Sequence, residues 1–296
     1  MTASHRRDPR SDRTGLLRLV GHLGTLSVTG TALVRCWSTL WVVPIVAAHG
    51  FVLVFLFCAE HECVHRTAFR ARRANDAVAA GIGVLLLLPS TWFRLFHAAH
   101  HRFTQDPLQD PELDGWKPAS RSGIVLQMTG LLYWKAMGQV VVNVARGRAE
   151  ATWLPSGHRR RVVRQVRATL LLYVALIVGS VATRSWIVVQ LWLLPALVGQ
   201  PFLRWYLLAE HTGCPTGQGI VAGTRTTLTN PVMRFFAWNM PFHREHHAHP
   251  QVPFHALPSL HSEWLASGAP HVGQLDRGYL RTVARLQRQR WRAAPR

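Results

Sequence analysis

The stretch "FLFCAEHECVH" (residues 55–65) joins an apolar run to two histidines that frame a glutamate and a cysteine. His61 and His65 are four residues apart, so on a helix both side chains project from the same face. Two interpretations are open at this point. The histidines could cap a buried helix at an interface, or they could bind a metal at a membrane surface. The rest of the sequence decides between these interpretations.

The distribution of apolar residues indicates a membrane protein. Hydrophobic residues make up 48% of the 296 residues and are concentrated in blocks, which is not typical of a soluble core. The formal net charge is +20, but the basic residues flank the apolar blocks, as in cytoplasmic loops beside anionic lipid. We therefore expect no nucleic-acid partner. The cysteines form no CxxC pair, so neither a disulfide frame nor a zinc knuckle is expected. No cleavable signal is visible.

Apolar stretches of near-spanning length set the predicted topology. A bilayer core requires about 20 helical residues, and the stretches near this length are 36–58, 77–93, 168–183 and 186–203. Pro44 leaves room for a break in the first of them. A weaker stretch, 15–34, is either a further span or an interfacial helix. Residues 124–145 are interrupted by polar side chains, which predicts a position along the interface.

The number of membrane crossings between the histidine motifs predicts that the motifs lie on the same side of the membrane. If 36–58 crosses and 77–93 returns, "HAAHH" (97–101) emerges beside "HECVH". The pair 168–183 and 186–203 then returns the chain again, so "HREHH" (243–247) lies on the same face. The intervening loop indicates that this face is cytoplasmic, because it contains Arg146, Arg148, Arg159, Arg160, Arg161, Arg164 and Arg167.

The sequence therefore predicts an all-α integral membrane protein with about four transmembrane helices in two hairpins. A cytosolic cap would hold the histidine-rich site, and the C-terminus would be cytoplasmic. We expect one domain over residues 1–296, with basic tails at both ends. The bacterial inner membrane is the expected location.

Three histidine clusters on one face favour the metal interpretation. His97, His100 and His101 are spaced i, i+3 and i+4, a fan of about 100° on a helix, and His243, His246 and His247 repeat this spacing. Neutral imidazole suits iron, copper, zinc or nickel. Together with His61 and His65, these side chains suffice for two metal ions and are too many for one.

At this point the sequence resembles the membrane fatty acid desaturase family, the integral-membrane non-haem di-iron enzymes that include acyl desaturases, hydroxylases and carotenoid ketolases. The resemblance covers residues from about 36 to 261 and rests on "HECVH", "HAAHH" and "NMPFHREHH" in that order. It implies a helical membrane fold whose cytosolic cap holds two irons.

The resemblance also implies individual residues. In acyl-CoA desaturases of this family a further histidine at the end of the last span ligates iron, and His211 in "LLAEHTG" matches it. The family asparagine four residues earlier is replaced by Leu207, with Glu210 as a substitute. The family's three histidine motifs are called boxes, and here they span residues 61–65, 97–101 and 243–247. Asn239 matches the asparagine that often precedes the third box.

The implied function is the O2-dependent introduction of a double bond into a fatty acyl chain, with two iron ions as cofactor and no catalytic residue beyond the metal centre. A lipid or carotenoid hydroxylase or ketolase of the same metal class is the alternative. A non-enzymatic membrane metal-binding protein is a distant one, because it would place its ligands mid-membrane. No "HPGG" motif or cysteine array is present, so the electrons would come from a separate ferredoxin, rubredoxin or cytochrome with its reductase.

Residues beside the predicted ligands could orient them, because a ligating histidine usually passes its other N–H to a carboxylate or carbonyl. The acidic residues near the boxes are Glu60, Glu62, Glu210, Glu245, Asp106, Asp110 and Asp114. Solvated charges and turn caps are the alternative roles for these side chains. Trp116 and Trp238, also close to boxes, are candidates to line a substrate tunnel.

Overall fold

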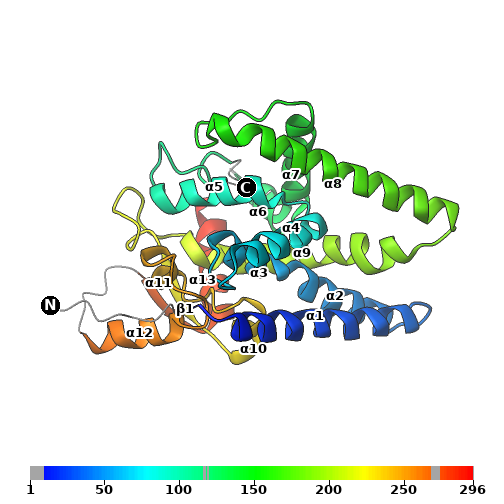
Figure 1. Ribbon diagram of the computed structural model, residues 1–296. Helices are drawn as coiled ribbons and strands as arrows, with labels where there is room; N and C mark the ends of the chain where they lie inside the picture. Colours follow the sequence, from blue (N-terminus) through cyan, green and yellow to red (C-terminus); the bar gives the residue numbers. More distant parts are fainter. Residues whose placement is uncertain (1–9, 116–117, 119, 268–273, 296) are drawn as a thin grey trace.

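The computed structural model describes residues 10–115, 118, 120–267 and 274–295, and most of these are helical (Figure 1). The elements in chain order are α1 (Asp12–Arg35), α2 (Val42–Val54), α3 (Leu56–His65), α4 (Arg72–Leu86), α5 (Ser90–Phe103), α6 (Arg121–Met128), α7 (Leu131–Ala145), α8 (Ser156–Ala182), the π-helix η1 (Val189–Leu193), α9 (Leu194–His211), β1 (Arg225–Leu228), α10 (Pro231–Phe236), α11 (His243–Ala248), α12 (Leu257–Ala266), β2 (Gln274–Arg277) and α13 (Tyr279–Ala293).

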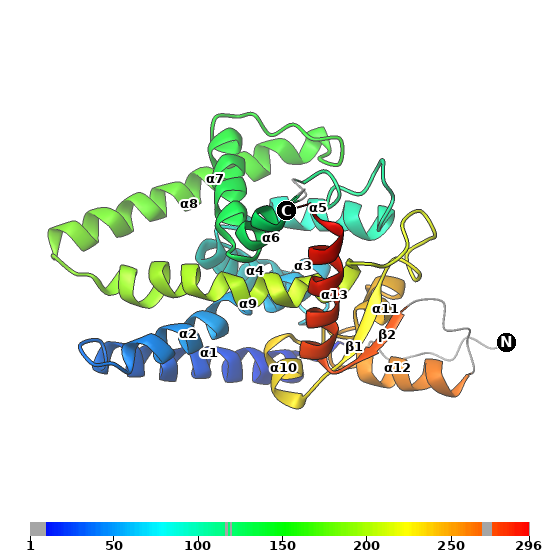
Figure 2. The same ribbon diagram turned by 180° about the vertical axis from the view of Figure 1, so that it is seen from behind.

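Two helical hairpins extend toward one end of the molecule. Figures 1 and 2 show α1, α2, α8 and α9 reaching that end, while α11, α12 and the strands lie at the other. Within the described residues, three segments are long and apolar enough to cross a membrane: α1, Val42–His65 and α8. The pair α4 and α5 is a fourth candidate, although the chain bends by 100° between these helices. These findings fit an integral membrane protein.

The hairpins differ in detail from those expected. The first pairs α1 with α2 and α3, so the stretch 15–34 is part of a helix of spanning length. Residues 36–41 form the turn, and the break in the next helix falls at Phe55 instead of Pro44. Pro44 lies in the first turn of α2, where its missing N–H leaves no helical hydrogen bond unmade.

The stretch expected at 77–93 is not one continuous helix, because α4 ends at Leu86 and the chain turns through Leu87, which has a φ of 54°. The stretch expected at 186–203 is divided between η1 and α9, and α9 continues to His211. The second hairpin is otherwise as expected, with α8 turning near Arg184 into η1.

The end of α4 has all of its last carbonyls hydrogen-bonded. A helix that stops in apolar surroundings would otherwise leave acceptors unpaired, at several kcal/mol each. Three of the last four carbonyls accept hydrogen bonds from aromatic side chains on α7, α8 and η1. The remaining carbonyl accepts hydrogen bonds from backbone amides. Gly83 O accepts from the amides of Leu87 and Leu88, Val84 O from Tyr173 Oη at 2.5 Å, Leu85 O from Trp192 Nε1 at 2.6 Å and Leu86 O from Tyr133 Oη at 3.1 Å.

The two hairpins are joined through glycines on α2 and α9. A Cβ atom at Gly199 would lie 2.3 Å from the carbonyl oxygen of Gly50, and one at Gly50 would lie 2.4 Å from that of Pro195. These separations are too short for any side chain, so the backbones of the two helices are in direct contact. Small residues allow this close approach in membrane proteins, where van der Waals packing holds helices together.

The cap contains a small parallel sheet that the all-α prediction lacked. Strands β1 and β2 pair from Arg225 opposite Gln274 to Leu228 opposite Arg277. The buried Arg225 guanidinium donates to the carbonyls of Ala209 and Thr212 at 2.9 Å and pairs with Asp276 at 2.9 Å. It therefore fastens the end of α9 to both strands. Strands of four residues without polar and apolar alternation give little sequence signal.

Replacing Gly199 with alanine should lower the stability of the helical bundle, because the new methyl group forces α2 and α9 apart. We expect a loss of about 1–3 kcal/mol, the usual cost of overpacking, measured by thermal unfolding in detergent. Gly179→Ala is the matched control, since a Cβ there meets nothing within 4 Å and alanine favours the helix. Equal melting temperatures for the two variants would refute the close contact.

Candidate metal centre

Nine histidine side chains from four helices converge in the cap. The rings belong to α3, α5, α9 and α11, and seven of them are buried while His65 and His211 are half-buried. Nitrogens of eight of these histidines form two compact groups, and within each group all ligand atoms lie within 4.8 Å of one another. The first group comprises His61, His65, His97, His101 and His246, and the second comprises His100, His211 and His247.

The Nε2 atoms of these rings face one another. The Nε2 atoms of His65 and His246 are 3.2 Å apart, and those of His97 and His101 are 3.0 Å apart. In the second group, His211 Nε2 lies 3.2 Å from that of His100 and 2.9 Å from that of His243, which adds His243 to this group. Two facing imidazole nitrogens can share only one proton. The remaining lone pairs suit a shared cation, so the donor set fits two first-row transition-metal ions.

The box on α11 is held neutral. Burial lowers the pKa of His243, His246 and His247 well below the usual value, and the neighbouring imidazoles lower it further. A neutral imidazole has a free lone pair and can ligate a metal without first losing a proton. The α11 histidines are therefore ready to act as ligands at neutral pH.

Three of the rings have a fixed orientation through Nδ1. His100 Nδ1 donates to Asp110 Oδ1 at 3.0 Å, and His211 Nδ1 donates to the carbonyl of Gly223 at 2.9 Å. His247 Nδ1 lies 3.0 Å from Thr104 Oγ1. Where Nδ1 carries the proton, Nε2 is left with its lone pair toward the centre.

Asp110 is itself a constrained group. Its carboxylate also accepts the backbone N–H of Gln105 at 2.7 Å and of Glu112 at 3.0 Å. Burial raises the pKa of Asp110, but the hydrogen bonds from His100 and from the two backbone amides outweigh this effect, so its pKa lies below the usual range. These bonds hold the Asp110 carboxylate in place beside His100.

The glutamates beside the boxes have different surroundings. Glu210 Oε1 is 3.7 Å from His243 Nδ1, beyond hydrogen-bond distance. Glu245 accepts hydrogen bonds from Thr226 Oγ1 at 2.5 Å, His261 Nδ1 at 2.7 Å and Arg244 Nη2 at 3.3 Å. Glu62 Oε1 accepts the backbone N–H of Phe254 at 3.0 Å. The buried Glu60 carboxylate has no hydrogen-bond partner in the described part of the chain.

The remaining predicted residues lie around the third box or outside the centre. Asn239 has a φ of 56° and bonds the carbonyl of Phe254 at 3.0 Å, so it orders the turn before α11. Asp106 accepts the backbone N–H groups of the following turn. Trp238 is fully buried and donates to His22 Nδ1 at 3.3 Å. Trp116 lies outside the described residues.

Sequence reasoning missed the partners that belong to no motif. Thr104 lies three residues after the second box, and its closeness in sequence to the box could have suggested a contact with the centre. Gly223 bonds His211 through its carbonyl, which no sequence pattern reveals. His22 lies on α1, where its Nε2 is 2.9 Å from the carbonyl of Val52. This ring joins α1 to α2 and, through Trp238, to the cap.

Comparison with known proteins places this geometry in a family. The fatty acid desaturase family matches residues 6–277. An sn-1 oleoyl-lipid 12-desaturase of Picosynechococcus sp. is 27% identical over 201 residues, which cover 61% of this chain and 55% of the relative. A protein of the same name from Synechocystis sp. is 24% identical over 209 residues, covering 65% and 54%. The chain spans about half the length of the curated relatives it matches. Because the family match extends over most of the residues, this chain belongs to the fatty acid desaturase family.

Proposed function

We propose that this protein is an O2-dependent membrane di-iron oxidoreductase that introduces a double bond into the fatty acyl chain of a lipid. The observation that carries the proposal is the pair of histidine groups whose Nε2 atoms converge. The family match supports desaturation as the activity. The names of two relatives support a lipid-linked acyl substrate.

Two irons are the proposed cofactor. The residues that would hold the first are His61, His65, His97, His101 and His246, and those for the second are His100, His211, His243 and His247. Two irons with O2 supply the oxidising power needed to remove hydrogen from an unactivated methylene. The residues around the centre contribute orientation: Asp110, Gly223 and Thr104 fix three rings. Glu62, Asn239 and Glu245 would hold the segments around α11 through their bonds to Phe254, Thr226 and His261. Glu210 lies beside His243 Nδ1 at 3.7 Å.

Water exclusion is the second contribution of the chain. Most of the rings are buried, so a substrate methylene would meet the centre in a dry environment in which side reactions with water are suppressed. Trp238 stands between His22 and Phe254, and we propose that it forms part of the wall behind the third box. The electrons would arrive from a separate ferredoxin, rubredoxin or cytochrome.

The proposed topology has four membrane helices in two hairpins: α1 with α2 and α3, and α8 with η1 and α9. The turns at 36–41 and 183–186 would lie on the periplasmic side of a bacterial inner membrane. The nine histidines, the cap and the C-terminus would lie in the cytoplasm, and the chain would act as one domain. The arginine-rich start of α8 supports this orientation through the positive-inside rule.

Expression of the wild-type chain in a bacterial host should yield protein with about two irons per chain and membrane lipids with an additional double bond. His211→Ala should remove most of the product and lower the iron content, because a ligand of the second group is lost. His158→Ala changes an exposed histidine on α8 and is the matched control. Elemental analysis and mass spectrometry of the fatty acids are the measurements. Stoichiometric zinc after iron-replete expression, or hydroxylated or ketone products alone, would contradict the proposal.

Asp110→Asn should weaken iron binding roughly ten- to hundredfold, the usual effect of losing a charged partner behind a ligating histidine. Asp106→Asn is its control, since that carboxylate only caps a turn four residues earlier in the same loop. Iron retention during titration with a chelator measures both variants. If Asp110→Asn holds iron as tightly as Asp106→Asn, then the bond to His100 has no role in metal binding.

Reporter fusions after Gly115 and at the C-terminus should both report a cytoplasmic location, because both positions lie on the cap side of the two hairpins. A fusion in the turn at Arg184 should report the periplasm and serves as the opposite-side control. A periplasmic signal from Gly115 or from the C-terminus would rule out the proposed orientation.

A further inference from the structure

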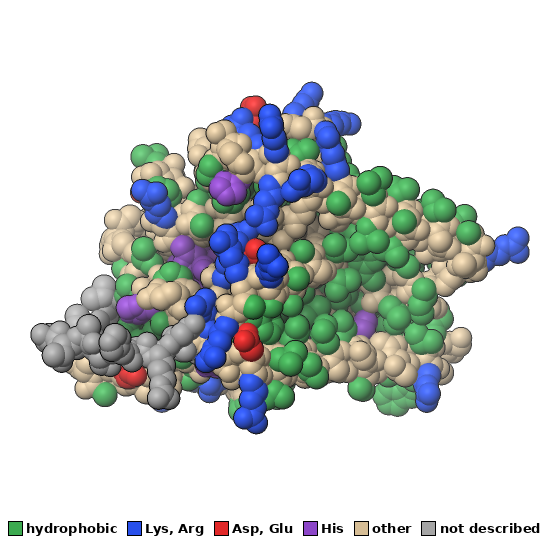
Figure 3. All heavy atoms as spheres, viewed as in Figure 1, with side chains coloured by type: hydrophobic (Ala, Val, Ile, Leu, Met, Phe, Trp, Pro, Cys, Tyr) green, Lys and Arg blue, Asp and Glu red, His purple; other side chains and the backbone are tan. Residues whose placement is uncertain are grey.

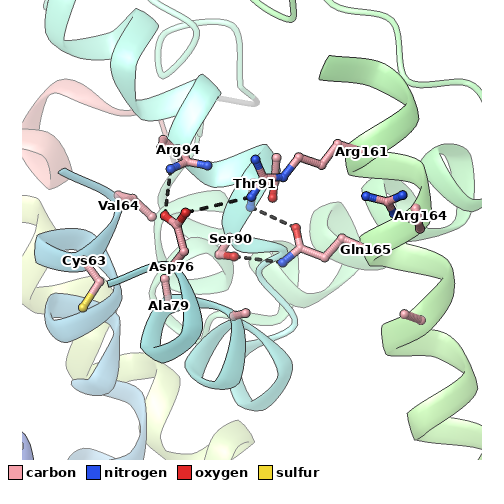
Figure 4. Close-up of a pocket in the computed structure, with 12 residues that line it drawn as sticks. Cys63, Val64, Asp76, Ala79, Ser90, Thr91, Arg94, Arg161, Arg164 and Gln165 are labelled. Carbon is pink, nitrogen blue, oxygen red and sulfur yellow. Dashed lines mark hydrogen bonds and ion pairs between the residues drawn. The ribbon is translucent and has the colours of Figure 1, made fainter. Parts of the chain in front are cut away.

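A cavity of about 410 Å³ lies between α3, α4, α5 and α8, outside the histidine centre (Figure 4). Its charged lining residues are Asp76, Arg94, Arg161 and Arg164. Figure 4 shows Arg94 and Arg161 turned toward Asp76, with Gln165 beside Thr91. The nine histidines do not line this cavity, so its chemistry requires a separate explanation.

The cavity has an excess of positive charge. Asp76 is its one carboxylate, and it is already bonded to Arg94 Nη1 at 3.0 Å and to Arg66 Nε at 3.0 Å. Arg161 Nη2 is 4.0 Å from Asp76, a distance that leaves most of its hydrogen-bonding capacity unused. Arg164 has no ion pair or hydrogen bond to any residue that the structure describes. Arg161 and Arg164 are therefore available to bind an anion.

The walls of the cavity are fixed before any ligand arrives. Gln165 Oε1 accepts the backbone N–H of Thr91 at 3.0 Å, and Gln165 Nε2 donates to Ser90 Oγ at 2.8 Å. These two bonds join the start of α5 to α8, one residue from Arg164. The arginines on α8 are thus held at a set distance from Arg94 on α5, and such preorganisation reduces the cost of binding.

The position along α8 indicates the source of the anion. Ala168 also lines the cavity, and beyond it α8 exposes an apolar face that includes Leu171, Val174, Ile177 and Val181. In the view of Figure 3, Lys and Arg side chains form a band that borders a broad apolar surface. The cavity therefore lies where the charged part of the helix meets the lipid-facing part, the depth of phospholipid headgroups.

We propose that this cavity binds the phosphate of an anionic membrane phospholipid, with Arg94, Arg161 and Arg164 as its ligands. Arginine is suited to this role because its planar guanidinium binds phosphate through paired hydrogen bonds. The acyl chains of the lipid lie along the exposed apolar face of α8. A soluble phosphate could bind the same arginines, but it has no acyl chains to contact the apolar face of α8. The site is independent of the reaction at the histidine centre.

Native mass spectrometry of the purified full-length protein tests the proposal, with phosphatidylglycerol and phosphatidylcholine as probes. The wild type should retain phosphatidylglycerol in preference to phosphatidylcholine. Arg161→Gln combined with Arg164→Gln should weaken this retention about twenty-five-fold, since each arginine that contacts an anionic lipid contributes a factor of about five. Arg160→Gln combined with Arg159→Gln removes the same charge from the same helix outside the cavity and should retain the lipid. All variants should keep the iron content of the wild type.

Two results would overturn the proposal. Equal losses in the cavity variant and in the Arg159/Arg160 control would mean that overall positive charge, without a defined site, attracts the lipid. Displacement of bound phosphatidylglycerol by inorganic phosphate at equal concentration would mean that the ligand is a soluble phosphate. Failure of the desaturation assay would leave this measurement unaffected, because lipid retention requires no turnover.

Discussion

Nine imidazole rings in one buried volume repel one another as soon as several are protonated, so the fold has to keep them neutral and oriented. Burial lowers the pKa of the α11 rings, and partners at Nδ1 direct the lone pairs of other rings inward. Much of the surrounding structure serves this requirement. Arg225 fastens the end of α9, and Asn239 shapes the entry to α11. Asp110 supplies the negative charge behind His100.

The early end of α4 is the second part of this arrangement. A straight helix through 77–93 would carry the second box away from α3, whereas the bend at Leu87 lets α5 run beside α3. Three aromatic donors and two amides bond the carbonyls that this bend exposes. Because these donors come from α7, α8 and η1, the placement of the second box depends on helices that contribute no histidine.

The sequence was most informative where residues of one type recur at helical spacing. The spacing of the box histidines predicted which rings share a face, and blocks of apolar residues predicted a helical membrane protein. Features set by tertiary contact were not predictable. The bend at Leu87 depends on distant tyrosines, and the break at Phe55 has no proline to mark it. Glu245 was predicted to orient a ligand because it is adjacent to one in sequence, yet its side chain bonds Thr226 and His261.

The parallel pairing of β1 with β2 has a consequence for the order in which the molecule is made. Parallel strands require a long connection between them. Here the connection contains α10, α11 and α12, and therefore the third box. The ends of this connection come together only when β2, which ends at Arg277, has paired with β1. Thr226 on β1 bonds Glu245 and bridges Phe242 at the start of α11. During synthesis, the first two boxes and His211 leave the ribosome well before this loop can close. The proposed metal sites would therefore be complete only after nearly the whole described chain has been synthesised.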